Sequence, residues 1–318
     1  MTEAQVRVAI VGTGDVGRGW AALCVAQGWP VALFDTNGKA LHSAAADIET
    51  RARHLVELER ADPDDVAIGL ERMVVGRSIL ETCRDAQWVI ECAPEDLLTK
   101  QRLFESIESV AGEARLVTSS SSALKTAEIV ARCIRQDRCL IAHPLNPPEL
   151  IPLVEIVPGP TTDLALVELL KGWLRGLDRI PVLVKKSVAG SVVNRIAAAV
   201  WREAIDLVLE GVVDVQDLDR AVSLGPALGW AAGGPHLSYH LASGDKGVSG
   251  FLQHLLKTFE MIWEDLATWT QLEPEQQRKL IHLIEKAYDE QVDALRPARD
   301  RRLGGILRGM ERVREKES

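Results

Sequence analysis

A glycine-rich turn between an apolar strand and a helix is the feature that most constrains how this 318-residue chain can fold. The residues Val8-Ala9-Ile10-Val11 predict a buried strand, which leads through the sequence GTGDVG at positions 12–17 into a predicted helix over 18–27. In such a turn Gly12 permits the tight bend, Gly14 lets a phosphate approach the backbone, and Gly17 lets the helix pack closely on the strand. The motif predicts a dinucleotide-binding turn. The alternative is a glycine-rich turn in an unrelated α/β protein.

An acidic residue follows the next predicted strand, Val31–Phe34, at the expected distance from this turn. There the Asp35 carboxylate is suited to bind the ribose hydroxyls of a dinucleotide, and its charge repels a 2′-phosphate. We therefore expect NAD rather than NADP as the cofactor. Asp15 and Val16 complete the cofactor-binding turn, and we expect the Asp15 carboxylate to point to solvent because it would repel a phosphate.

The chain divides into two regions of different character. Up to Lys186, β-branched runs alternate with helical stretches, which predicts a Rossmann-type, mostly parallel sheet with helices on both faces. After it, apolar residues recur at helical spacing over 189–210, 215–224 and 246–269, and Glu273-Pro274 opens a further helix. We predict an NAD-binding domain over 1–186 and an all-helical substrate and dimerisation domain over 187–318. The strands are expected at 6–11, 31–34, 88–92, 116–119, 139–142, 153–157 and 180–184.

Composition excludes several other classes of function. The formal charge of −9 argues against nucleic acid or an anionic membrane as the main partner. We find no secretory signal pattern and no apolar run long enough to span a bilayer. The five cysteines form no Cys-x-x-Cys pair and are odd in number, so we expect no zinc site, no disulfide framework and a reducing cytoplasm.

A nicotinamide enzyme that oxidises an alcohol needs a side chain to accept the hydroxyl proton. The Tyr-x-x-x-Lys pair of short-chain dehydrogenases is missing, because neither Tyr239 nor Tyr288 has a lysine four residues later. The zinc ligand pattern of zinc alcohol dehydrogenases is missing too. Of the seven histidines, most read as exposed helix residues. His236 and His240, one helical turn apart, lack the glutamate of a His-Glu-x-x-His metal site.

His143 differs from the other histidines. It ends the predicted buried strand Cys139-Leu140-Ile141-Ala142, where ligands of parallel sheets bind. Glu155 lies inside another apolar strand, where a carboxylate is costly unless it is paired. A His143–Glu155 pair would resolve both features, with the glutamate orienting the imidazole for proton transfer. The alternative is that His143 has only a structural role, with its ring nitrogens satisfied by hydrogen bonds.

At these residues the chain resembles the 3-hydroxyacyl-CoA dehydrogenase family, and most closely its lambda-crystallin branch, which includes L-gulonate 3-dehydrogenase. The resemblance covers nearly the whole chain. It rests on the glycine turn with Asp35, the serine run 119–122 and four short segments, namely ECAPED at 91–96, HPLNPP at 143–148, PLVEIV at 152–157 and VVNR at 192–195.

The resemblance implies that His143 is the catalytic base and Glu155 its partner. It further implies that Ser122 and Asn194 bind the substrate near the reacting oxygen, and that Asn146 holds the histidine or the nicotinamide. Taken singly, Ser122 could instead cap a helix, and Asn194 could be an ordinary helix residue.

The same resemblance implies that Glu95 and Lys100 contact the cofactor, although Lys100 alone would read as a solvated helix lysine. It also implies a homodimer formed by the helical region. Ser122 is assigned within the serine run by its distance from Leu124.

Two departures from the family pattern bear on the substrate. The helix expected after the second strand is mixed in charge and has no lysine over residues 46–60, which argues against a CoA thioester. Gly229 stands where related members tend to carry an arginine suited to a substrate carboxylate. The resemblance and the first departure favour a small hydroxy acid such as L-gulonate as substrate, and Gly229 leaves the exact acid open. The alternatives are L-carnitine, a 3-hydroxyacyl-CoA, or a non-enzymatic crystallin or NAD sensor.

Overall fold

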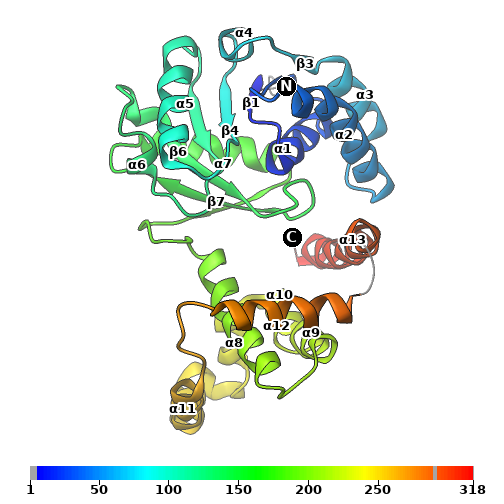
Figure 1. Ribbon diagram of the computed structural model, residues 1–318, viewed down its shortest axis with the longest axis vertical. Helices are drawn as coiled ribbons and strands as arrows, with labels where there is room; N and C mark the ends of the chain where they lie inside the picture. Colours follow the sequence, from blue (N-terminus) through cyan, green and yellow to red (C-terminus); the bar gives the residue numbers. More distant parts are fainter. Residues whose placement is uncertain (1–5, 289–291, 318) are drawn as a thin grey trace. The chain divides into compact units, whose positions relative to one another are not determined.

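The computed structural model describes residues 6–288 and 292–317, which fall into two compact units that divide between Arg195 and Ile196 (Figure 1). The first unit contains a single eight-stranded sheet with the strand order β3-β2-β1-β4-β5-β6-β7-β8. Neighbouring strands are parallel except β6 and β7, which are antiparallel. The strands are β1 Val8–Val11, β2 Val31–Phe34, β3 Val74–Val75, β4 Trp88–Glu91, β5 Leu116–Ser119, β6 Cys139–Pro144, β7 Leu153–Pro158 and β8 Ile180–Leu183.

Helices cover both faces of this sheet. On one face, Phe104 and Ile107 of α5 and Ile129 of α6 join the apolar core beneath the strands. On the other, Trp20 of α1 and Trp173 of α7 contact the ring of Trp88 in β4. The helices are α1 Asp15–Ala26, α2 Gly38–Glu57, α3 Pro63–Glu71, α4 Ile79–Cys83, α5 Leu97–Val110, α6 Thr126–Ile129 and α7 Leu164–Gly176, with a 3₁₀ turn η1 at Gln136–Arg138.

Polar side chains before the helices set where several of them begin. Asn37 accepts hydrogen bonds from the first amides of α2, and Asp96 does the same for α5. Asp163 caps α7 in the same way. Each cap satisfies a backbone donor that has no partner within its own helix.

The second unit is entirely helical. Its helices are α8 Val193–Leu209, whose first three residues belong to the first unit, α9 Val215–Leu224, α10 Pro226–Leu241, α11 Gly247–Asp265, α12 Pro274–Ala287 and α13 Val292–Glu317, with a 3₁₀ turn η2 at Gly244–Lys246. Its buried cluster is small, with Ile205, Leu209 and Leu280 at the centre. Among the described residues of α9 and α10, none is fully buried.

The sequence predicted this fold class correctly: a mostly parallel Rossmann-type sheet is followed by a helical region. All seven expected strands are present. No range was predicted for the two-residue strand β3 or for the helices α3, α4, α5, α6, α7, α10 and α13, although Lys100 was placed on a helix and the region after 187 was predicted to be helical. No helix within residues 6–288 and 292–317 has both the length and the apolar character needed to cross a membrane.

Candidate active site

A cavity of about 770 Å³ opens at the carboxyl ends of β1, β2 and β4. The glycine turn, Asp35 and the first residues after β4 line it, together with one side of α5. This is the place where a doubly wound sheet binds a dinucleotide.

The glycine turn has the geometry that a bound diphosphate requires. Gly12 adopts a left-handed φ of 106°, and a Cβ there would lie 2.6 Å from the Cys92 carbonyl oxygen. A Cβ at Gly14 would meet nothing within 4 Å, so this residue leaves open space beside the turn. The start of α1 has no side-chain cap, which leaves its first amides available to an anion. These features fit the diphosphate of NAD.

Asp35 ends β2 at the rim of this cavity. Its Oδ2 accepts hydrogen bonds from the Thr13 amide at 2.6 Å and the Thr13 hydroxyl at 3.0 Å. Its Oδ1 accepts one from the Asn37 amide at 2.8 Å. The carboxylate is thereby fixed against the glycine turn at the position expected for a ribose-binding residue.

Asp15, the residue that seemed out of place in a phosphate-binding turn, has a cationic partner. It is exposed, as expected, and its carboxylate forms an ion pair with the guanidinium of Arg51 from α2. The pairing places a positive charge against this carboxylate beside the turn.

A second cavity of about 410 Å³ adjoins the first, and both are lined by Val16, Cys92 and Ala93. It brings together His143, Ser122, Asn146 and Asn194, as well as Glu95 and Lys100. Residues from the ends of the three strands β4, β5 and β6 and from the start of α8 therefore meet next to the cofactor cavity. Of the residues predicted for catalysis, only Glu155 does not line this cavity, because it lies behind His143.

His143 and Glu155 are directly opposite each other in the antiparallel pair β6–β7. The distance from His143 Nδ1 to Glu155 Oε2 is 2.9 Å. His143 is 6% exposed and Glu155 is fully buried. The two oddities that the sequence presented, a histidine at a strand end and a carboxylate inside an apolar strand, thus form one buried pair.

The second oxygen of Glu155 is bound by two backbone amides. Its Oε1 accepts hydrogen bonds from the amides of Val192 and Val193 at the start of α8, at 2.8 and 3.1 Å. When Glu155 is ionised, its Oε2 is an acceptor as well, and Nδ1 of His143 is then the donor of their shared hydrogen bond. The other ring nitrogen, Nε2, is left as the acceptor in the neutral imidazole.

Alternate residues of the serine run have different surroundings: two donate hydrogen bonds to carboxylates and two line the cavity. Ser119 and Ser121 are buried, and they donate to the carboxylates of Glu91 and Glu95, at 2.5 and 2.6 Å. Ser120 and Ser122 line the second cavity. The Asn194 side-chain amide lies 3.5 Å from the Ser122 carbonyl oxygen, so it belongs to the same part of the cavity wall.

Lys100 is buried in an ion pair that the sequence did not suggest. Its Nζ lies 2.8 and 3.1 Å from the two carboxylate oxygens of Glu91, the last residue of β4. Lys100 is 1% exposed and Glu91 is fully buried. The sequence did carry a signal for Glu91, because a carboxylate at the end of an apolar strand calls for a partner, as it does at Glu155.

Glu95 holds the serine run against this ion pair. Its Oε1 accepts hydrogen bonds from the backbone amides of Ser122 and Ala123 at 3.0 and 2.9 Å. Burial acts to raise the pKa of the Glu95 carboxyl, but the hydrogen bonds from Ser121 and Ala123 and the charge of Lys100 outweigh it and lower the pKa below its usual range. The cavity wall therefore presents an ionised carboxylate near neutral pH.

Two other kinds of chemistry find no support at this site. Burial raises the pKa of the Cys92 thiol to about 12, so this cavity-lining cysteine stays protonated and is a poor nucleophile. In the part of the chain that the structure describes, no group of three or more His, Cys, Asp or Glu side chains is arranged to hold a metal ion.

Comparison with known proteins agrees with this geometry. The NAD-binding domain model of 3-hydroxyacyl-CoA dehydrogenase matches residues 7–188, and the C-terminal domain model of the same family matches residues 190–281. The chain is 33% identical to an L-carnitine dehydrogenase of Nocardiopsis dassonvillei, over 99% of this chain and 95% of that protein. It is 34% identical to the lambda-crystallin homolog of Homo sapiens, over 81% of this chain and 82% of that protein.

A solved structure shows the same fold over almost the full length. It is an NAD-dependent 5-formyl-3-hydroxy-2-methylpyridine 4-carboxylic acid 5-dehydrogenase, with a TM-score of 0.79 and 26% identity over 97% of this chain and 99% of that one. The family matches together span both units, and the site geometry provides for the cofactor that they imply. This chain is an NAD-dependent dehydrogenase that acts on a CH–OH group, and it belongs to the 3-hydroxyacyl-CoA dehydrogenase family.

Proposed function

We propose that the substrate is a small, free 3-hydroxy acid and that His143 is the base that removes its hydroxyl proton. The observation that carries this proposal is the buried His143–Glu155 pair, which leaves Nε2 of the imidazole as an acceptor at a cavity next to the cofactor turn. NAD, when bound, accepts the hydride from the carbon that bears the hydroxyl.

The other residues around the two cavities bind and position the substrate and the cofactor. Ser122 and Asn194 are the hydrogen-bonding groups for the substrate oxygen, and Asn146 positions the nicotinamide or the histidine beside it. As the proton moves from the hydroxyl to Nε2, the imidazole becomes positively charged, and the Glu155 carboxylate stabilises that charge. Asp35 binds the adenosine ribose, while the glycine turn with Val16 binds the diphosphate. Glu95 and Lys100 contact the nicotinamide half of the cofactor.

The charges on α2 support a free acid over a CoA thioester. A CoA substrate carries phosphates that need available cationic side chains. Arg51 is paired with three carboxylates, and Arg53 is paired with Glu49 at 2.8 Å. Both arginines of α2 are thus engaged within the protein itself.

The proposal is tested by following NADH formation with a panel of hydroxy acids. We expect turnover with free 3-hydroxy acids and little with 3-hydroxybutyryl-CoA. L-Carnitine, which the similar dehydrogenases are named for, and L-gulonate, which the lambda-crystallin branch suggests, are the first two compounds to compare. A CoA thioester that is used much better than every free acid would overturn the assignment.

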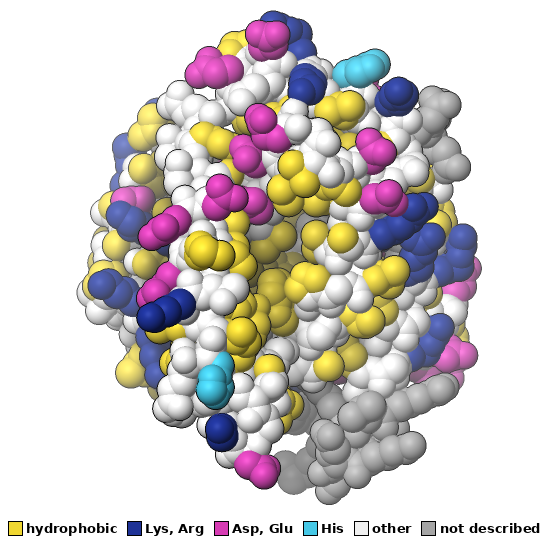
Figure 2. Space-filling model, turned by 90° about the horizontal axis from the view of Figure 1, so that it is seen from below, with side chains coloured by type: hydrophobic (Ala, Val, Ile, Leu, Met, Phe, Trp, Pro, Cys, Tyr) yellow, Lys and Arg dark blue, Asp and Glu magenta, His cyan; other side chains and the backbone are white. Residues whose placement is uncertain are grey.

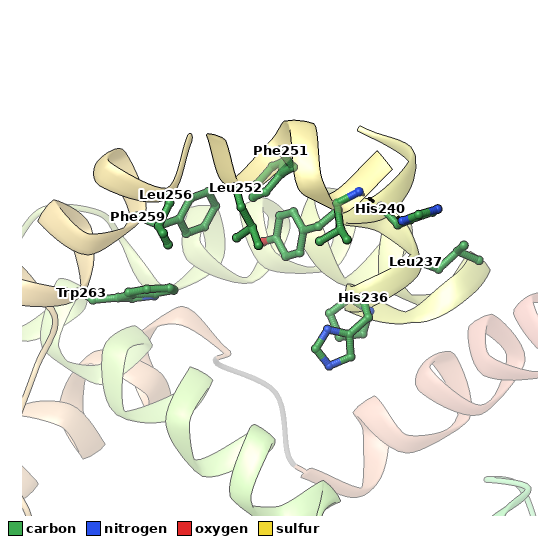
Figure 3. Close-up of a pocket in the computed structure, with 11 residues that line it drawn as sticks. His236, Leu237, His240, Phe251, Leu252, Leu256, Phe259 and Trp263 are labelled. Carbon is green, nitrogen blue, oxygen red and sulfur yellow. Dashed lines mark hydrogen bonds between the residues drawn. The ribbon is translucent and has the colours of Figure 1, made fainter. Parts of the chain in front are cut away.

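We further propose that a second copy of this chain covers the apolar face of α10 and α11. The two helices line a hollow of about 790 Å³ with aromatic and aliphatic side chains, among them Phe251, Phe259 and Trp263 (Figure 3). Figure 2 shows one face of the molecule, which is hollowed near its centre, and hydrophobic side chains gather around that hollow. Exposed apolar surface of this kind on a small helical unit is typical of a subunit interface.

Light scattering at micromolar concentration is expected to show a dimer. Trp263, whose side chain is 55% exposed, lies on the proposed interface, and Trp263→Glu should convert the dimer into a monomer. Ile134→Glu is the matched control, since Ile134 is 93% exposed but lies in the other unit. Trp269, by contrast, packs against the core of its own unit and donates a hydrogen bond to Asp206 at 2.8 Å. A monomeric parent protein would contradict the proposal.

A further inference from the structure

One arginine of α2 connects three segments that surround the cofactor turn. The guanidinium of Arg51 pairs with Asp15, the first residue of α1, and with Asp47, one turn earlier in α2 at 3.0 Å. Its Nη1 lies 3.0 Å from Oε1 of Glu149, in the loop that follows β6. That loop begins after Pro144, one residue beyond His143, and includes Asn146, so Arg51 links the cofactor turn to the loop of the second cavity.

The loop is packed tightly against α1 at the point where Arg51 binds it. A Cβ on Gly19 of α1 would lie 2.6 Å from Glu149 Oε2 and 2.7 Å from Pro148 Cδ. Glu149 is only 7% exposed, and its Oε2 has no hydrogen-bond partner among the described residues. Burial raises the pKa of Glu149, and Arg51 acts in the opposite direction. A buried carboxylate of this kind is costly once its cationic partner is removed.

Asp15 needs the same arginine for a different reason. It is the first residue of α1, where a helix amino terminus favours a negative charge and where the diphosphate of a dinucleotide also binds. Without the positive charge of Arg51, the Asp15 carboxylate would repel the diphosphate more strongly and compete with it for the first amides of the helix.

We propose that Arg51 is a positioning residue for the reaction: it cancels the charge of Asp15 beside the diphosphate and anchors the Glu149 loop next to α1. It touches neither the reacting atoms nor the substrate. Its two functions act through two different carboxylates, so they can be separated by substitution.

The test measures NAD affinity by calorimetry and thermal stability by circular dichroism, with no substrate present. Arg51→Met should weaken NAD binding roughly tenfold or more and lower the unfolding temperature. Arg53→Met is the matched control, because Arg53 lies on the same helix, is 64% exposed and pairs only with Glu49 among the ion pairs that the structure describes. It should leave both quantities close to those of the parent protein.

Two double variants separate the two functions. Asp15→Asn with Arg51→Met removes the repelling charge, so NAD affinity should return to within about threefold of the parent while stability stays low. Glu149→Gln with Arg51→Met removes the unpaired buried carboxylate, so stability should recover while NAD affinity stays weak. A purely structural arginine predicts instead that affinity and stability recover together, and that result would overturn the proposal.

The experiment remains decisive if Arg51→Met alone does not fold. Glu149→Gln then serves as the background, since it removes the charge that needs the arginine. Adding Arg51→Met to it should weaken NAD binding, and adding Asp15→Asn as well should restore it. Unchanged affinity in the first of these steps would contradict the role assigned to Arg51. Because only NAD is bound, the outcome is independent of which hydroxy acid the enzyme oxidises.

Discussion

His143→Gln is expected to lower kcat by roughly a hundred- to ten-thousandfold, the usual contribution of a general base. Glutamine can keep a hydrogen bond to Glu155, but it cannot accept the hydroxyl proton. NAD affinity should remain close to that of the parent protein, because the glycine turn and Asp35 lie in the other cavity. Steady-state kinetics with the best substrate of the panel and calorimetry with NAD measure the two effects.

The matched control is His54→Gln, which removes a histidine from α2 whose ring contacts only the exposed Glu57 side chain among the described hydrogen bonds. Its kcat should be unchanged. A His143→Gln enzyme that keeps more than about a tenth of the parent rate would show that another group removes the proton.

Glu155→Gln tests whether Glu155 sets the tautomer of His143 that the reaction needs. The amide oxygen of glutamine can still accept from Val192 and Val193, but its NH₂ group then faces Nδ1 of His143. The imidazole must respond by placing its proton on Nε2, which removes the acceptor that the reaction needs. We therefore expect a fall in kcat of roughly a hundredfold or more. An active Glu155→Gln enzyme would show that the carboxylate does not set the tautomer.

The pattern of buried strands was predictable because it depends on local composition. Most of the predicted strands are short runs rich in β-branched or aliphatic residues that are followed by a polar or glycine residue, as Val31–Phe34 is followed by Asp35. β3 carries no such signal, since Val74 and Val75 are both exposed and form an edge strand only through their pairing with β2. Helix α7 was missed although it begins at the capping residue Asp163 and has an apolar face, both visible in the sequence.

The His143–Glu155 pair was predictable as a hypothesis, but its geometry was not. The sequence gives two residues twelve positions apart, and a buried charge that needs a partner. Their direct opposition depends on β7 running antiparallel in an otherwise parallel sheet, which only long-range packing decides. The two amides that bind Glu155 are more than thirty-six residues further along the chain, so no local pattern could indicate them.

The ion pairs around the cofactor show the same limit. The resemblance pointed to Lys100 as a cofactor contact, but nothing indicated that Glu91 and Lys100 would be buried together. Asp15 likewise read as an isolated charge until the packing of α1 on α2 placed Arg51 beside it. Charged residues on separate elements become partners only through tertiary structure, whereas strands and caps are specified by neighbours in sequence.

Lys100→Met is expected to destabilise the fold by about 3–5 kcal/mol, the usual cost of removing one partner of a buried ion pair. Methionine fills much of the same space, so the main change is the loss of the positive charge beside Glu91. That carboxylate would keep its hydrogen bonds from the Ala93 amide and the Ser119 hydroxyl, at 2.6 and 2.5 Å, but no cation. Urea unfolding followed by circular dichroism measures the difference.

The double variant Lys100→Met with Glu91→Gln should recover most of the lost stability, because it leaves no uncompensated charge in the interior. Lys125→Met is the control on an exposed pair: Lys125 lies 3.5 Å from Glu128 with its side chain 56% exposed, and losing it should cost less than about 1 kcal/mol. If Lys100→Met costs no more than this control, the pair does not stabilise the fold. If the double variant is stable and binds NAD as tightly as the parent, Lys100 is not a cofactor contact, and its role at the cavity wall is to hold Glu91 and the end of β4 in place.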